Sequence, residues 1–186
     1  MKKFELTTES ITNEAGKKLF RIKALIDFGD VKAGELGGYV EKEGNVSQDD
    51  NAWVYGDAWV YGDARVYGNA RVYGDAEVAG NARVSDNAEV YGDAEVYGNA
   101  WVSGNARVSG DADYALIQGF GTEFRCTTFY RGKNEKIMVN CGCFHGDLEE
   151  FRKQVKETRS GKIAKEYLMI ADLMEYHFAS EDSGDE

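Results

Sequence analysis

The chain has 186 residues and a formal net charge of −11, a length that suits one domain or two small ones. Such an acidic balance argues against direct binding to nucleic acid or to an anionic membrane, since both need clustered Lys and Arg. It suits a basic partner or a protein that mimics nucleic acid.

Targeting and redox features point to the cytoplasm. No run of about 18 apolar residues predicts a membrane span, and residues 1–5 lack the apolar core of a signal peptide. Three cysteines are too few for a disulfide framework in a chain of this length. We therefore expect a cytoplasmic protein without a membrane partner.

Two strands are predicted ahead of the repeats. Residues 4–7 and 19–26 are rich in strand-forming side chains, and a turn around Asn13–Gly16 joins them. This pattern predicts a β-hairpin that forms an N-terminal cap over residues 1–34. Residues 34–40, together with Val46, then form an irregular first coil that leads into the repeats.

A six-residue repeat decides the fold. From Asn51 to Ala112 the chain repeats the pattern Asn/Asp-Ala-x-Val-Tyr/Ser/Ala-Gly/Asp, with ten complete copies. Alternation along each short strand places Ala and Val on one side, with x and the residue after Val on the other. Gly followed by Asn or Asp makes each turn, because these residues tolerate positive φ. A chain that bends every six residues and stacks on itself is a β-helix, expected over residues 35–118.

These hexads resemble the left-handed β-helix family, in which Gly-Asn or Gly-Asp follows an aliphatic residue and precedes a small one, as in Val54–Ala58. The resemblance implies a mainly β fold: a left-handed parallel prism with three hexads, or 18 residues, per triangular coil. Physical preference alone would favour a right-handed crossover. The sequence supports the 18-residue period independently, because identical residues recur at that spacing. One column contains Asn51, Asn69, Asn87 and Asn105, and a second contains Asp57, Asp75, Asp93 and Asp111.

Outward-facing side chains also form columns on the three faces of the predicted prism. They can stabilise neighbouring strands laterally, or they can form an interface, since exposed Trp, Tyr and Arg anchor contacts. A thin prism cannot bury three tryptophans internally, so we expect a homo-oligomer, a dimer or trimer, that covers them. The candidate binding residues on the prism are Trp53, Tyr55, Trp59, Tyr73, Tyr91, Trp101, Arg65 and Arg83.

Acidic columns are a second feature of the prism. Neighbouring carboxylates about 5 Å apart repel each other by roughly 1 kcal/mol in water, and turn amides or water can offset that. The column that begins at Asp57 is interpreted as a solvated edge, with weak Ca²⁺ or a cationic partner as the alternative. On another face, Trp59 heads a column of Glu77, Glu95 and Asp113, beside Tyr61 and Tyr97.

A small α+β module is predicted over residues 119–178. Residues 124–130 and 136–140 have the composition of two strands joined in a hairpin. Asp147–Glu150 is a capping box that begins a helix, and residues 163–178 form a second helix with one apolar side. The module either caps the open end of the coil, which would block edge-to-edge polymerisation, or adds a binding site to it.

The segments on both sides of the repeats resemble uncharacterised β-helix proteins of phages and prophages. The resemblance rests on the run into Asn51–Val54, on Asn140–Phe144 and on the acidic helix start at Leu148–Phe151. It implies a phage or prophage origin and, with it, the cytoplasm of the host. No known activity accompanies these motifs. Residues 179–186 are an acidic tail that we expect to be disordered.

One set of residues in the module has the composition of a metal site. Its four soft or borderline ligands could hold a structural Zn²⁺. Their spacing is not that of a usual zinc knuckle, so buried free thiols are the favoured interpretation and zinc is the alternative. We expect no cofactor. The four residues are Cys126, Cys141, Cys143 and His145.

Catalysis is not expected, although the family resemblance includes many acyltransferases that use a histidine as general base. The chain has two histidines, His145 and His177, and both lie after the repeats. No loop interrupts the hexads to build a pocket, and function follows the site rather than the fold. An acyltransferase is therefore the least favoured alternative.

The favoured function is that of a non-catalytic binding protein. Its rigid acidic and aromatic prism, together with the module, would bind and inhibit a host macromolecule in the manner of an anti-defence protein, or sequester a small nucleotide signal. The alternative is a structural or self-assembling protein, such as part of a virion or a polymer. The candidate binding residues in the module are Phe129, Tyr130, Arg131, Phe144 and His145.

Overall fold

The computed structural model describes residues 1–132 and 135–179, and these residues form two compact units. The first unit is Met1–Asp111, and the second begins at Ala112. This division differs from the predicted boundary at residue 118, because residues 114–120 pair with residues 125–131 in the sheet of the second unit. The acidic tail predicted over residues 179–186 lies outside the described residues from 180 onward.

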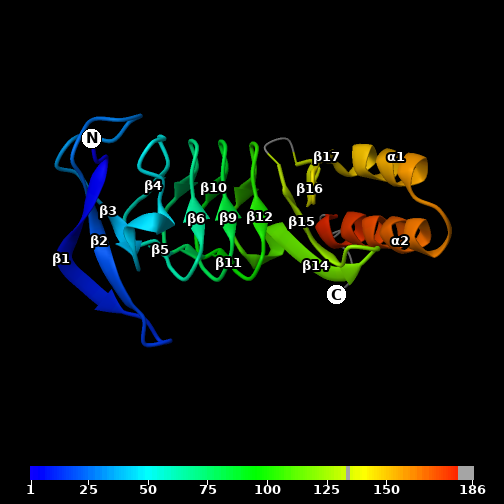
Figure 1. Ribbon diagram of the computed structural model, residues 1–186, viewed down its shortest axis with the longest axis horizontal. Helices are drawn as coiled ribbons and strands as arrows, with labels where there is room; N and C mark the ends of the chain where they lie inside the picture. The colour runs from blue at the N-terminus through cyan, green and yellow to red at the C-terminus, as the bar shows by residue number, and fades with distance from the viewer. Residues whose placement is uncertain (133–134, 180–186) are drawn as a thin grey trace, which may run out of the picture. The chain divides into compact units, whose positions relative to one another are not determined.

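The repeats form a parallel β-solenoid, as predicted (Figure 1). Three columns of two-residue strands run along it, and each strand pairs with the strand one coil away. Glu89, for example, pairs with Arg71 on one side and Arg107 on the other, a spacing of 18 residues in both directions. The strands are β4 (Trp53–Val54), β5 (Trp59–Val60), β6 (Arg65–Val66), β7 (Arg71–Val72), β8 (Glu77–Val78), β9 (Arg83–Val84), β10 (Glu89–Val90), β11 (Glu95–Val96), β12 (Trp101–Val102) and β13 (Arg107–Val108).

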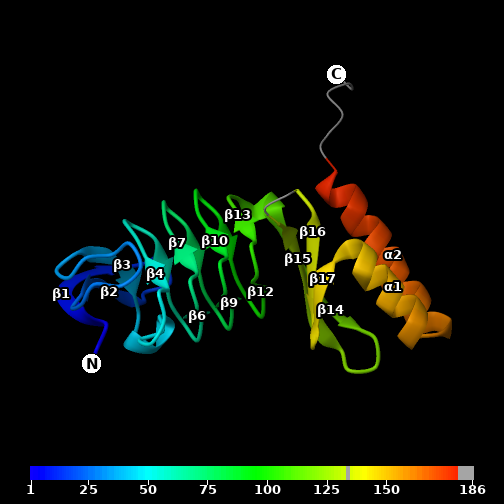
Figure 2. The same ribbon diagram turned by 90° about the horizontal axis from the view of Figure 1, so that it is seen from above.

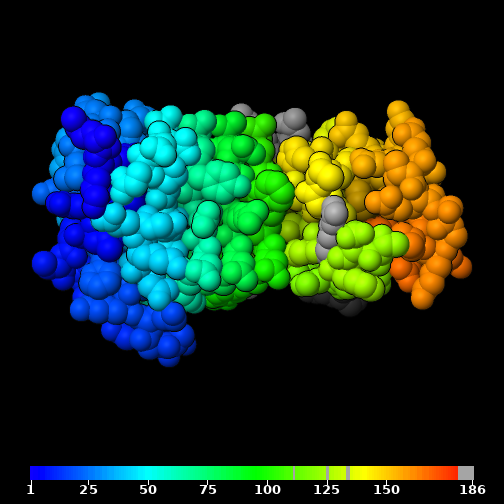
Figure 3. Space-filling view, viewed as in Figure 1, coloured from blue at the N-terminus to red at the C-terminus, as the bar shows by residue number. Residues whose placement is uncertain are grey.

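The interior of the solenoid is built from alanine and valine. The Ala and Val of each hexad are fully buried, from Ala52 and Val54 to Ala106 and Val108. These small side chains allow the coils to stack closely, and backbone hydrogen bonds such as Tyr61 N–H to the Val78 carbonyl, at 3.0 Å, connect one coil to the next. Figure 3 shows the same stacking as successive coloured bands without open gaps between the coils.

The predicted N-terminal hairpin is present, and it extends one face of the solenoid. Strands β1 (Phe4–Thr12) and β2 (Lys18–Ala24) are antiparallel, and β3 (Leu36–Val40) follows beside β2. Strand β3 then pairs in parallel with β5, so that the sheet has the order β1-β2-β3-β5-β8-β11. A 3-10 turn (Glu43–Asn45) leads from β3 towards the first hexad. The hairpin is therefore continuous with the face that contains Trp59.

The second unit is a four-stranded antiparallel sheet with two helices (Figure 2). A second 3-10 turn, Asp111–Asp113, comes directly before the first strand of this sheet. The hairpin and both helices were predicted, whereas the first and last strands were not. Side chains of both helices pack with Phe129 and Val139 of the sheet in one core. The elements are β14 (Tyr114–Phe120), β15 (Arg125–Arg131), β16 (Ile137–Cys141), β17 (Phe144–Asp147), α1 (Leu148–Thr158) and α2 (Gly161–Phe178).

The predicted capping box begins α1. The Glu150 N–H donates to Asp147 Oδ1, and the Asp147 N–H donates to Glu150 Oε2, both at 2.9 Å. Two backbone donors at the helix start are thereby satisfied. Neither helix of the described residues is long and apolar enough to cross a membrane.

Candidate functional site

The eight candidate binding residues on the solenoid lie on three different faces, so the structure does not gather them into one site. Trp53, Tyr55, Tyr73 and Tyr91 belong to the face of β4, β7, β10 and β13. Trp59 lies on the face of β5, β8 and β11. Arg65, Arg83 and Trp101 lie on the face of β6, β9 and β12.

Trp53 was predicted to be an exposed binding residue, and this prediction is wrong. Its side chain is completely buried. Phe4 and Phe28 pack edge-on against it, with ring centroids 5.8 and 5.3 Å away. The N-terminal segment covers this end of the column, which a pattern of hexads alone cannot reveal. One of the three tryptophans that motivated a homo-oligomer is therefore covered within the chain itself.

The tyrosine column on the same face is a lateral contact between coils. Tyr73 and Tyr91 stack with ring centroids 5.1 Å apart and an interplanar angle of 7°. The Tyr55 hydroxyl donates to Asp30 Oδ1 at 2.9 Å, and burial together with this bond raises the pKa of Tyr55 to about 12. These contacts agree with the lateral-stabilisation alternative, since stacked aromatic neighbours stabilise adjacent strands.

Most candidate residues of the C-terminal module are engaged in its own fold. Phe129 and Tyr130 are completely buried, so their prediction as surface binding residues is wrong. Phe144 packs against Phe151 with ring centroids 5.5 Å apart. Arg131 donates to the Phe178 carbonyl at 2.9 Å and pairs with Asp113 at 3.2 Å. Asp113 itself belongs to the 3-10 turn Asp111–Asp113 and not to a strand of the hexads.

The zinc alternative is not supported either. Strand pairing places Cys141 opposite Thr127 and His145 opposite Asn140. Because successive side chains alternate across a sheet, Cys126 and Cys141 point to opposite faces, and so do Cys141 and His145. Cys143 is exposed in the turn between β16 and β17. Within residues 1–132 and 135–179, no three His, Cys, Asp or Glu side chains are grouped closely enough to hold a metal ion.

One face of the solenoid contains a pocket lined by acidic and aromatic side chains, which we call the acidic pocket. Trp59 and Tyr61 come from the coil of β5, whereas Glu77, Glu95 and Tyr97 come from the two coils that follow. The turn of the N-terminal hairpin, Asn13 to Ala15, provides the remaining wall. The volume of this pocket is about 390 Å³.

Glu77 is the central acceptor of the acidic pocket. The Tyr61 hydroxyl donates to it, and Tyr97 forms a second side-chain hydrogen bond to it. Burial and the bond to Glu77 raise the pKa of Tyr61 to about 12 and raise the pKa of Tyr97 as well. Glu95 lies directly opposite Glu77 in the parallel register, an arrangement in which like charges repel.

Acidic and aromatic side chains dominate the lining of the acidic pocket. None of the described residues that line it is Lys or Arg, while Glu14 adds a third acidic side chain. Lys17, two residues beyond Ala15 of the pocket wall, pairs with Glu41 at 2.8 Å. The acidic pocket therefore has a negative field beside aromatic surfaces.

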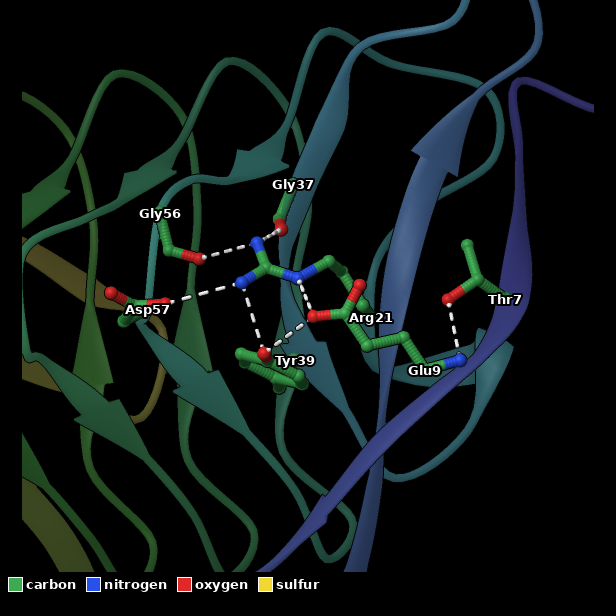
Figure 4. A network of polar contacts seen from close by, with 7 residues as sticks. All are labelled: Thr7, Glu9, Arg21, Gly37, Tyr39, Gly56 and Asp57. Atoms are coloured by element: carbon green, nitrogen blue, oxygen red, sulfur yellow. Dashed lines mark hydrogen bonds and ion pairs between the residues drawn. The ribbon is translucent and has the colours of Figure 1, made fainter.

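A network of polar contacts around Arg21 holds the hairpin, and hence the pocket wall, on the solenoid (Figure 4). The Arg21 guanidinium donates to Glu9 of β1 at 2.8 Å and to the Gly37 carbonyl at 2.9 Å. It also reaches Asp57 of the first hexads at 3.3 Å and stacks over the Tyr39 ring at 4.5 Å. Hydrogen bonds from Tyr39 and Arg21 lower the pKa of the Glu9 carboxyl.

Sequence reasoning found part of this site. The column of Glu77 and Glu95 below Trp59, beside two tyrosines, follows from the 18-residue period. The hairpin turn was missed as a wall, because no local signal shows that β3 pairs with β5 and so brings residues 13–15 to this face.

Comparison with known proteins supports the solenoid. A family model described as the YdcK beta solenoid repeat matches residues 64–80. These residues include β6, β7 and β8, one from each face, so the similarity concerns the repeat itself. A search of curated proteins finds no match to this chain.

Proposed function

We propose that this chain is a non-catalytic binding protein whose acidic pocket takes a basic side chain of a partner protein. One observation carries the proposal: Glu77 and Glu95 adjoin Trp59 and Tyr97 in a cavity of about 390 Å³ whose described lining contains no Lys or Arg. The repeated coils are the rigid scaffold that fixes these side chains.

The chemistry of the pocket favours a guanidinium or an ammonium group. Two carboxylates can share one cation, and charge-assisted hydrogen bonds to carboxylates are the strong ones. Trp and Tyr faces attract cations through the ring quadrupole, by about 0.5–2 kcal/mol according to desolvation. A basic ligand would also offset the repulsion between Glu77 and Glu95, which lie opposite each other in the register.

The resemblance of the flanking segments to phage and prophage proteins supports a host partner. The protein would then be an anti-defence inhibitor that engages a host defence or nucleic-acid-handling protein through an exposed Arg or Lys. Proteins that bind nucleic acid expose such side chains, which makes them suitable partners for an acidic pocket.

The chemistry can be tested by NMR titration of the full chain with arginine amide and with citrulline amide, which has the same shape without the charge. The three tryptophan indole N–H signals are built-in reporters. We expect the Trp59 signal to shift saturably with arginine amide and not with citrulline amide. The buried Trp53 signal should stay in place.

Two variants test the role of Glu77, one of them as a matched control. Glu77→Gln should abolish the shift, whereas Glu89→Gln should retain it, because Glu89 occupies the equivalent hexad position on another face, between Arg71 and Arg107. Equal shifts with arginine amide and citrulline amide, or equal loss in both variants, would contradict the proposal.

A further inference from the structure

A groove on another face of the solenoid has the opposite chemistry, and we call it the arginine groove. Residues 43–49 form one of its sides, where the Ser47 N–H donates to the Val66 carbonyl at 2.9 Å. Strands β6 and β9 provide Arg65 and Arg83 on the other side. The volume of the groove is about 760 Å³, within the range of about 300–1,000 Å³ typical of sites for small molecules.

Arg65 and Arg83 lie directly opposite each other in the parallel register, and both are exposed. Among the residues that the structure describes, neither guanidinium has a carboxylate within 4.0 Å. The other two arginines of the hexads differ in this respect: Arg71 pairs with Asp30 at 3.4 Å, and Arg107 with Glu89 at 3.7 Å. The arginine groove therefore contains two adjacent guanidinium groups that form no ion pair with the described part of the chain; Asp63, on which Arg65 acts electrostatically, pairs with Lys42 at 2.7 Å.

Two acidic side chains also line the groove, and both lie close to other cations. Glu43 pairs with Lys2 at 2.7 Å. Asp49 lies near the ammonium group of Lys3. Burial lowers the pKa of Lys3 to about 8, and the carboxylates of Asp50 and Asp49 partly oppose this shift. The overall charge of −11 is spread over the chain and is screened beyond about 8 Å at physiological salt. The local field at Arg65 and Arg83 therefore favours an anion.

Tyr67 is the aromatic side chain of the groove lining, and it lies two residues beyond Arg65 on the same side of the strand. A guanidinium pair binds phosphate oxygens bidentately, and an aromatic ring beside it offers a stacking surface for a planar group. We propose that the arginine groove binds a small phosphate-bearing ligand, with the phosphate held between Arg65 and Arg83 and a planar group on Tyr67. This site is separate from the acidic pocket and does not depend on the function proposed for it.

Calorimetric titration of the full chain with three probes tests the assignment. ADP contains both a phosphate and a planar base, pyrophosphate lacks the base, and adenosine lacks the phosphate. We expect saturable binding of ADP and of pyrophosphate, with adenosine at least about tenfold weaker. Arg65→Gln and Arg83→Gln should each weaken ADP binding by about tenfold or more.

Arg107→Gln is the matched control, because Arg107 occupies the same hexad position but already pairs with Glu89. It should change ADP affinity by less than roughly twofold. Thermal unfolding of Arg65→Gln and Arg83→Gln should occur no lower than in the wild type, since each variant removes one of two repelling charges. The assignment is overturned by adenosine binding as tightly as ADP, by an absence of saturable heat with all three probes, or by equal losses in all three variants.

Two further variants test the independence of this site from the acidic pocket and the role of Tyr67. Glu77→Gln should leave ADP binding intact, because Glu77 lies on a different face from Arg65. Tyr67→Ala should weaken ADP but leave pyrophosphate unaffected. If Tyr67→Ala weakens both probes equally, the stacking role of Tyr67 is wrong.

Discussion

At the scale of single residues, the acidic pocket is organised by hydrogen bonds to the Glu77 carboxylate. Glu77 accepts from Tyr61 and is joined by a second hydrogen bond to Tyr97, so both phenols are held close to a carboxylate. A negative charge beside a phenol opposes formation of a second negative charge. Burial of the Tyr61 hydroxyl and its hydrogen bond to Glu77 together raise the pKa of Tyr61 to about 12, which can be measured.

We predict that the protein loses stability as the pH rises from about 10 to about 12. The pKa of Tyr61 is raised from its ordinary value of 10.0 to about 12 in the folded chain. Above pH 10 the unfolded state releases this proton first, so the stabilisation is complete below pH 10 and is lost as the pH approaches 12. Tyr55 and Tyr97 act in the same direction.

Tyr61→Phe should reduce this alkaline loss, measured as the change in thermal unfolding midpoint between pH 9 and pH 12. The difference in tyrosinate absorbance between the wild type and Tyr61→Phe should titrate near pH 12. A difference titration centred near pH 10 would show that Glu77 does not hold Tyr61 in its neutral form.

Single residues also mark where sequence reasoning succeeds. The alternation of residues along each strand predicted that the Ala and Val of every hexad are buried, and both are buried in all ten copies. Trp53 occupies the same hexad position as Trp59, yet Trp53 is buried and Trp59 lines a pocket. The difference comes from Phe4 and Phe28, which are distant in sequence, so no local pattern could have revealed it.

At the scale of elements, the turns of the solenoid hold neighbouring coils at close distance. Gly74 has a positive φ of 74°, and a Cβ added there would lie 2.9 Å from the Gly92 carbonyl oxygen. Gly56 has a φ of 58°, but a Cβ added there would meet no atom within 4 Å. Both glycines have a positive φ, which disfavours any side chain. Of the two, only Gly74 also lies so close to the next coil that a Cβ would clash with it.

We predict that Gly74→Ala destabilises the protein more than Gly56→Ala does. Both variants should cost about 1–2 kcal/mol, because a side chain disfavours the left-handed conformation. Gly74→Ala should cost about 1–3 kcal/mol more, since the coils must move apart to admit the methyl group. Urea unfolding of both variants measures the difference, and equal losses would show that the inter-coil approach is not a constraint.

The elements of the second unit show where pattern reasoning stops. The β15–β16 hairpin and both helices have local signals, namely alternating strand residues, a capping box and an apolar helix side. Strands β14 and β17 are edge strands of the sheet, and β17 is only four residues long. Whether these segments form strands depends on partners elsewhere in the chain. For this reason the repeat pattern predicted that residues 114–118 belong to the solenoid.

At the scale of the whole molecule, the solenoid presents faces of different charge. The acidic pocket and the arginine groove lie on different faces of the same stack, which a six-residue repeat with 18-residue coils makes possible. A repeat of six permits three independent columns, and each column can evolve its own side chains while the Ala and Val interior stays constant. The fold was therefore predictable from the period, whereas the chemistry of each face required the positions of the N-terminal segments.

The most direct test of the proposed binding function is capture of partners from a bacterial host lysate with three immobilised full-length baits. These are the wild type, the double variant Glu77→Gln with Glu95→Gln, and Glu89→Gln as the matched control. Quantitative mass spectrometry should find a protein that the wild type and Glu89→Gln retain and that the double variant loses. Identical sets of captured proteins from all three baits would contradict a binding function of the acidic pocket.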